Sequence, residues 1–284
     1  METKEWALIL FTVISQAAVG AFLLITWFRT VNKDAAMDAA YKKANLVLLP
    51  LAAIALITTL FHLGHPERAL NALRNLSTSW LSREIFFAGG FFVMLLVSVL
   101  TEKTVAVRKI VDWLTVLAGI CAVVSMAAVY DLSMKPAWQG FHTYVAFVVT
   151  ALFLGAALAA GLVVLFGKDH AQVAPNLQVL IWVAAAAVVA ELIAFPFYLA
   201  SLQMGGKAAQ ATLAMLAGQY GTALIARWAL ALVGGLVPLM FVRRQLSAGK
   251  TATGLVYTAL LFVLAGELVG RYLFYMTGVK IMIG

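Results

Sequence analysis

The feature that most constrains this chain is a series of long, almost uninterrupted apolar blocks. A helix that crosses a bilayer needs roughly 20 mainly apolar residues, and these blocks reach that length. A backbone in lipid must satisfy its own hydrogen bonds, and the blocks lack the alternating pattern of barrel strands. The sequence therefore predicts an all-α integral membrane bundle of eight transmembrane helices. We expect the spans near residues 6–28, 46–63, 84–100, 112–130, 143–166, 177–200, 222–242 and 253–276.

The composition leaves little room for anything else. Of the 284 residues, 64% are hydrophobic and only 11% are charged, whereas soluble domains carry about 25% charge. Eight spans would take about 160 residues, so no soluble catalytic domain fits in the remainder. No linker or internal repeat divides the chain, and we expect one transmembrane anchor domain over residues 1–284.

Charge and cysteine usage exclude further classes of protein. The net charge is +8, but Lys and Arg residues stand singly or in pairs between the apolar blocks, as juxtamembrane residues do. Nucleic-acid binding is therefore not expected. The single cysteine, Cys121, excludes an internal disulfide and a four-cysteine iron–sulfur site built from this chain alone.

The distribution of Lys and Arg predicts the orientation. These residues are more numerous in the links after spans 1, 3, 5 and 7 than on the other side. Because short cytoplasmic loops carry the positive excess, both termini are expected outside, in the periplasm of a Gram-negative cell. The expected location is the cytoplasmic (inner) membrane of a bacterium or archaeon, crossed several times.

Ionisable side chains in the predicted spans gather toward one membrane face. Such residues are costly in lipid, so each is a candidate for function. The group consists of His62, Glu84, Glu191, Arg227, Glu267 and Arg271. With the orientation above, they fall toward the outer leaflet, and we expect no comparable group in the inner half. This pattern predicts a one-sided site rather than an ion or proton path across the whole membrane.

The outer loop after the second span carries the most local information. Gly64 and Pro66 suit the end of one helix and the start of another. Leucines then recur on one face with charged residues on others, which predicts a short interfacial helix near 66–76. Ser82 can cap the third span, and Glu84 in its first turn would then be favoured by the helix dipole.

A histidine and a carboxylate beside an apolar bundle also suit quinol chemistry. Oxidation of a quinol releases two protons with two electrons, and imidazole exchanges protons near neutral pH. A carboxylate in a partly dry setting can take part as well. Nearby phenylalanines such as Phe87 and Phe91 could hold the ring and the tail. By residue type alone, a histidine satisfied at the interface is an equally good interpretation of His62.

Structural explanations compete for the remaining ionisable residues. Glu267 precedes Arg271 by four residues, the favoured order for an intrahelical pair. Glu191 and Arg227 could form a second pair between helices. These four residues are therefore expected to be structural ion pairs or, alternatively, a secondary site.

Two further classes of function stay open. A haem held by His62 and His142 is conceivable because both fall on the outer side, although haem ligands in bundles usually lie well inside the helices. A small transporter would need polar groups near the membrane midplane and repeat symmetry. Neither is evident in the sequence.

Three stretches resemble one known family. They are HLGHPERALNALRNLSTSWLSREI at residues 62–85, GELVGRYLFY at 266–275 and EWALILFTVISQAAVGAF at 5–22. They are similar to the DmsC family, the membrane-anchor subunits of anaerobic dimethyl sulfoxide reductase. The resemblance implies an eight-helix anchor with both termini outside that binds no metal or covalent cofactor itself. It also implies two partners: a molybdopterin catalytic subunit and a subunit with four [4Fe-4S] clusters.

The resemblance assigns a quinol site. In that family a histidine and a glutamate at these motif positions are tied to menaquinol oxidation, and they correspond to His62 and Glu84 here. Gly64, Arg68 and Asn71 are the implied neighbours that shape the site. Menaquinol would be an exchangeable substrate, and the terminal substrate would be reduced by another subunit.

Two residues depart from the family pattern and leave the electron direction open. His65 stands where a small polar residue is usual, and Arg83 replaces a neutral side chain before Glu84. A second imidazole and an extra cation could change the proton affinity or the quinone preference of the site. Related anchors serve complexes that run in reverse, for example sulfite oxidation with quinone reduction, and these residues do not separate the two directions.

Overall fold

The fold is a bundle of long helices. The computed structural model describes residues 3–32, 34–61, 71, 73–167, 170–248 and 252–281. Within these ranges there is no β-strand, and eight helical segments are long and apolar enough to cross a membrane. The prediction of an all-α protein with eight spans is confirmed. The assignment of the termini to the outer membrane face stays a prediction.

The helical elements are numbered in chain order. They are α1 (Thr3–Val31), α2 (Ala35–Leu60), α3 (Trp80–Leu100), α4 (Val105–Asp131), η2 (Pro136–Trp138), α5 (Phe141–Phe166), α6 (His170–Met204), α7 (Lys207–Ala217), α8 (Gly221–Ala229), η3 (Leu230–Leu236), α9 (Val237–Ser247) and α10 (Thr253–Met276).

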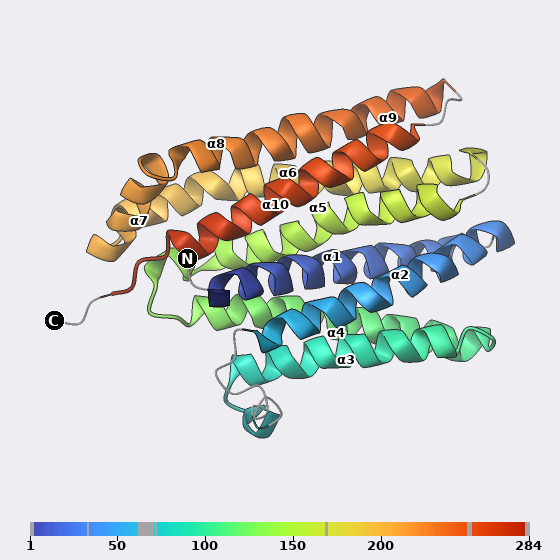
Figure 1. The fold of residues 1–284 in the computed structure, drawn as a ribbon, viewed down its shortest axis with the longest axis horizontal. Coiled ribbons are helices and arrows are strands. Elements are labelled where there is room, and N and C mark those ends of the chain that lie inside the picture. The colour runs from blue at the N-terminus through green and yellow to red at the C-terminus, as the bar shows by residue number, and fades with distance from the viewer. Residues whose placement is uncertain are drawn as a thin grey trace.

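The spans run up and down along one long axis (Figure 1). One end of the bundle holds the starts of α1, α3 and α5 and the end of α10, and we call it the terminal end because both chain termini lie there (Figure 1). The opposite end, where α1 joins α2 and α3 joins α4, is called the distal end. All the sequence-predicted site residues that the structure describes belong to the terminal half.

Two helices form the centre of the bundle. Helices α1 and α5 are the most buried spans and pack directly against each other. They approach closely at Gly20 and Gly155, where a Cβ added to Gly20 would lie only 1.7 Å from the carbonyl oxygen of Ala151. Small residues at this crossing allow the two backbones to touch, which is a common means of holding membrane helices together.

The start of α3 corrects one prediction. The helix begins at Trp80 because the Ser79 side chain accepts a hydrogen bond from the Ser82 backbone N–H at 3.3 Å. The prediction that Ser82 is the cap is therefore wrong, and Ser82 is buried inside the helix. Glu84 consequently lies beyond the first turn, where the helix dipole no longer explains it.

The seventh span is not a regular helix. It runs through α8, η3 and α9, and η3 is a π-helical stretch just before Pro238. Proline lacks a backbone N–H, so the ladder upstream must rearrange, and a π-bulge is one way to do so. Gly234 lies on the α10 side of this stretch, where an added Cβ would come within 2.5 Å of the Phe262 ring.

Two short segments complete the comparison with the sequence. Helix α7 was not predicted, because its alanine-rich sequence lacks the strong apolar signal of a span. The interfacial helix expected near 66–76 falls largely outside the described residues. Of that segment, Asn71 and residues 73–75 form 3₁₀-helical turns.

Candidate functional site

The structure describes the predicted quinol site only in part, on the side formed by α3. His62, Gly64 and Arg68 lie outside the described residues, and Asn71 is exposed. Glu84, in contrast, is buried within α3, with only 6% of its surface exposed. A carboxyl group in this position is costly in a membrane protein unless it has a task or a partner.

The neighbouring Arg83 has a structural role. Its guanidinium donates hydrogen bonds to the backbone oxygens of Leu76 at 2.9 Å and Ser77 at 2.7 Å. The same group lies 4.3 Å from the centre of the Trp80 ring. Arg83 therefore fixes the end of the loop against the start of α3.

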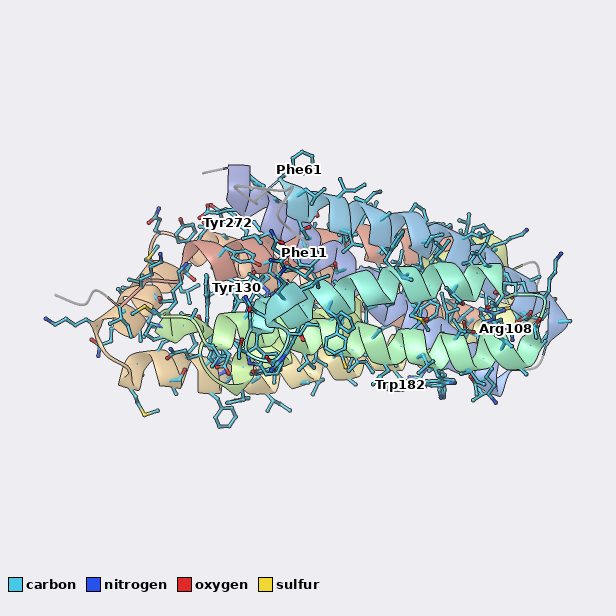
Figure 2. All side chains as sticks on the ribbon, turned by 90° about the horizontal axis from the view of Figure 1, so that it is seen from below. Phe11, Phe61, Arg108, Tyr130, Trp182 and Tyr272 are labelled. Atoms are coloured by element: carbon cyan, nitrogen blue, oxygen red, sulfur yellow. The ribbon has the colours of Figure 1, made fainter. Side chains whose placement is uncertain are left out.

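Two buried tyrosines lie in the same region as Glu84. Tyr130 of α4 and Tyr275 of α10 are close enough to Glu84 to be affected by its charge. The two phenol oxygens are 2.6 Å apart and share a hydrogen bond. Figure 2 shows Tyr130 near the start of α3. A carboxyl group and a hydroxyl pair from three helices thus meet in the apolar interior of the terminal half.

Aromatic rings surround the tyrosine pair. Trp138 stacks on Phe274 with ring centres 5.1 Å apart and donates its indole N–H to the Phe274 carbonyl oxygen at 2.7 Å. Lys135, in the link between two spans, lies 3.7 Å from the Trp138 ring centre. Partial burial, together with the charge of Lys280, lowers the pKa of the Lys135 ammonium. These contacts close the terminal end over Tyr130.

Arg271 and Glu267 are both buried but are linked through a third residue. Arg271 donates to the Gln16 side-chain oxygen of α1 at 2.8 Å and lies 3.8 Å from the Phe147 ring centre. The Thr150 hydroxyl donates to Glu267 at 2.6 Å and accepts from Arg271 at 3.5 Å. The structure therefore bridges Glu267 and Arg271 through Thr150, with no direct ion pair within 4.0 Å.

Glu191 of α6 and Arg227 of α8 form an ion pair between helices. Gly270 makes room for it, because a Cβ at that position would come within 2.3 Å of the Arg227 Nε. The four residues expected as structural pairs or a secondary site all line one cavity between α5, α6, α8 and α10. His142 lies at the same cavity, and its Nε2 is 3.0 Å from the Ala137 carbonyl oxygen.

The distal end holds a second ionic cluster, which the sequence analysis did not expect. Arg29 joins Glu102 through two hydrogen bonds of 2.9 and 3.0 Å and reaches Asp38 at 3.0 Å. Asp112 lies 3.6 Å from Arg29, and Arg108 lies 3.5 Å from Glu102. The expectation of no comparable group in the other half is wrong, because these residues looked like juxtamembrane charges in the sequence.

The carboxyl groups at the two ends of the bundle differ in whether they have ionic partners. At the distal end, the carboxylates are paired with arginines. The described residues contain no group of three His, Cys, Asp or Glu side chains that could hold a metal. Glu84 makes no hydrogen bond or ion pair within normal distance limits to another described residue. Glu84 is therefore the carboxyl group best placed to exchange a proton with a ligand.

Sequence reasoning identified Glu84 but missed its two tyrosines. Tyr130 and Tyr275 are 145 residues apart, and each looked like an ordinary aromatic residue near the end of a span. The available signal was that both fall at the same predicted membrane face as Glu84. Thr150 and Gln16, the partners of Glu267 and Arg271, carried no signal of their own.

Comparisons with known proteins agree on one family. A family described as the DMSO reductase anchor subunit (DmsC) matches residues 1–277. The anaerobic dimethyl sulfoxide reductase protein YnfH of Escherichia coli K12 is 31% identical, covering 95% of this chain and 94% of that protein. The C subunit of anaerobic dimethyl sulfoxide reductase from the same organism is 28% identical over the same shares. Its counterpart in Haemophilus influenzae is 31% identical over 56% of this chain and 59% of its own length.

Proposed function

Because the chain belongs to the DmsC family of dimethyl sulfoxide reductase anchor subunits, we propose that it binds menaquinol, oxidises it and passes the electrons to an iron–sulfur subunit. The site lies at the terminal end, beside Glu84 of α3. The protein is a multi-pass membrane anchor, and the proposal gives that anchor a part in anaerobic respiration. The terminal substrate is reduced on a different subunit.

The chemistry divides between protons and electrons. A quinol that loses two electrons also loses two protons and becomes a quinone. His62 takes one hydroxyl proton, and Glu84 takes the other or passes a proton on to water at the terminal end. The two electrons would leave to the partner subunit, where a [4Fe-4S] cluster would serve as a one-electron acceptor. Tyr130 and Tyr275, which hydrogen-bond to each other, line the Glu84 side of the site in this proposal.

The burial of Glu84 is the observation that carries the proposal. A carboxyl group that is 6% exposed and has no described ion-pair partner is suited to change protonation when a ligand arrives. The apolar surroundings suit a naphthoquinol ring, since ligand sites combine apolar walls with a few polar groups. Phe91, buried on the same helix, belongs to those walls.

The proposal also specifies the partners. Electron transfer is fast only over short distances, so the iron–sulfur subunit docks at the terminal end, near Glu84. That subunit carries four [4Fe-4S] clusters and relays electrons to a molybdopterin catalytic subunit. With both termini in the periplasm, as the charge distribution predicts, these subunits face that compartment.

Menaquinol oxidation by the intact complex tests the proposal. Glu84→Gln keeps the size of the side chain but cannot take up a proton, so quinol-dependent dimethyl sulfoxide reduction should fall by roughly 100-fold, the lower range for a lost acid–base group. Glu5→Gln is the matched control, because Glu5 lies at the same end, in the first turn of α1, and is only partly buried. Unchanged turnover in Glu84→Gln would remove Glu84 from the site.

Assays of the same complex also measure the direction of electron flow. If the complex oxidises its substrate and reduces menaquinone, while it fails to oxidise menaquinol, the reverse function replaces the one proposed here. Both directions use the same residues, so the Glu84→Gln variant should lose activity in either case.

A further inference from the structure

The cavity lined by Glu191, Arg227, Glu267 and Arg271 lies in the terminal half of the bundle. It is bounded by α5, α6, α8 and α10 and has a volume of about 100 Å³. We call it the α5–α10 cavity. Its polar lining consists chiefly of His142, Glu191, Tyr198, Arg227, Glu267 and Arg271. Glu84 is not among the lining residues of this cavity.

The charges around the α5–α10 cavity cancel. Arg227 is paired with Glu191. Arg271 and Glu267 both hydrogen-bond to the Thr150 hydroxyl. An anionic head group would meet two carboxylates here, and a cation would meet two guanidinium groups. The lining therefore favours a neutral head group whose oxygens accept hydrogen bonds, or both donate and accept them.

Polar and aromatic groups on α5 and α6 offer such bonds. The Tyr198 hydroxyl makes no hydrogen bond within normal limits to another described residue, so it is free to serve a ligand. The Tyr198 ring lies 4.5 Å from the His142 ring, and the Phe195 ring lies 5.4 Å from that of Trp228. Flat aromatic walls beside a donor and carboxylate acceptors suit a planar ring with two oxygens.

An apolar groove shares part of its α5 wall with the cavity. It runs between α1, α5 and α6, has a volume of about 700 Å³ and is lined by residues such as Leu23, Trp27, Val148 and Val183. Val145 of α5 lines both the groove and the α5–α10 cavity. A ligand that fills both spaces has a compact polar head and a long hydrocarbon tail.

We propose that the α5–α10 cavity and the adjoining groove form a second binding site for a neutral isoprenoid quinone or quinol, with the head ring between Tyr198 and Arg227 and the tail along α5 and α6. The site binds without a redox step of its own. It lies at the same end of the bundle as the proposed oxidation site. The inference is carried by different residues from those of the proposed function, so either can fail alone.

Photoaffinity labelling of the intact complex in lipid nanodiscs tests this inference. The probe is an azido-naphthoquinone with a prenyl tail, and the labelled residues are located by mass spectrometry. Labels are expected on α5 and α6 residues that line the cavity, and excess unlabelled naphthoquinone should displace them. Tyr198→Phe should reduce this labelling several-fold, as expected for one lost hydrogen bond. Tyr220→Phe, a matched change on a tyrosine that does not line the cavity, should leave it unchanged.

Two further variants make the outcome decisive. Ala194→Trp places a large side chain in the cavity wall and should remove at least nine-tenths of the labelling there. Glu84→Gln should leave the cavity labelling intact even where it abolishes quinol oxidation. Labels found only near α3, labels displaced by anionic phospholipid but not by naphthoquinone, or equal labelling in Tyr198→Phe and Tyr220→Phe would each overturn the second site.

Discussion

Replacing Arg29 by methionine should destabilise the distal end strongly. The Arg29 side chain is 2% exposed and contacts three carboxylates: Asp38, Glu102 and Asp112. Removing one partner of a buried pair leaves the other charges in a poorly solvated setting, at a cost of about 3–5 kcal/mol. Arg108 and Lys42 also reach this cluster and offset part of the loss. The expected decrease in Tm is on the order of 10 °C.

Thermal unfolding in detergent, followed by tryptophan fluorescence, measures this effect. Lys42→Met is the matched control because Lys42 joins two of the same carboxylates, Asp38 and Glu102, but its side chain is 42% exposed. An exposed pair contributes only about 0–1 kcal/mol, so the control should shift Tm by a few degrees at most. Arg29→Lys, which keeps the charge but loses the double contact to Glu102, should fall between the two.

The proposed quinol site lies at the other end of the bundle, so Arg29→Met should retain quinol oxidation at low temperature. Equal Tm values for Arg29→Met and Lys42→Met would refute the reasoning, because burial would then make no difference to the value of the pair. Loss of activity at temperatures where the variant is folded would show that the cluster has a role beyond stability.

Three other substitutions test the packing and the caps. Gly20→Val should greatly reduce the yield of folded protein because its side chain would collide with the α5 backbone, whereas Gly90→Ala, with open space around it, should be tolerated. Ser79→Ala should cost about 1 kcal/mol through the lost cap of α3, which melting curves would register. Trp138→Phe removes a hydrogen bond to a backbone oxygen and should lower stability by about 1 kcal/mol, and an unchanged Tm would contradict its closing role at the terminal end.

The spans were predictable from the sequence because hydrophobic length alone determines them. All eight appear, since the apolar blocks have only one stable way to cross lipid. The start of α3 was harder to predict from the sequence, because serine is a favoured cap residue and both Ser79 and Ser82 are available. The structure shows that Ser79 makes the capping hydrogen bond. The irregular turn before Pro238 follows from local chemistry that a count of apolar residues does not contain.

The candidate site was predictable only in part, because its contacts join distant segments. Glu84 was found as an ionisable residue within a span, but its proximity to Tyr130 depends on how α3 packs against α4. Arg29 and Glu102 are 73 positions apart, and in the sequence each is simply a charge near a span end. Residues that act through tertiary contact carry no local pattern, so only the packed bundle reveals them.

The most direct test of the central claim is the turnover of reduced naphthoquinol by the intact complex, with dimethyl sulfoxide as acceptor, in wild type and His62→Ala. An artificial donor that reduces the catalytic subunit directly serves as the internal control. The account predicts that the variant loses quinol-dependent turnover by roughly 100-fold or more while donor-dependent turnover is unchanged. Equal quinol oxidation by the two proteins would contradict it.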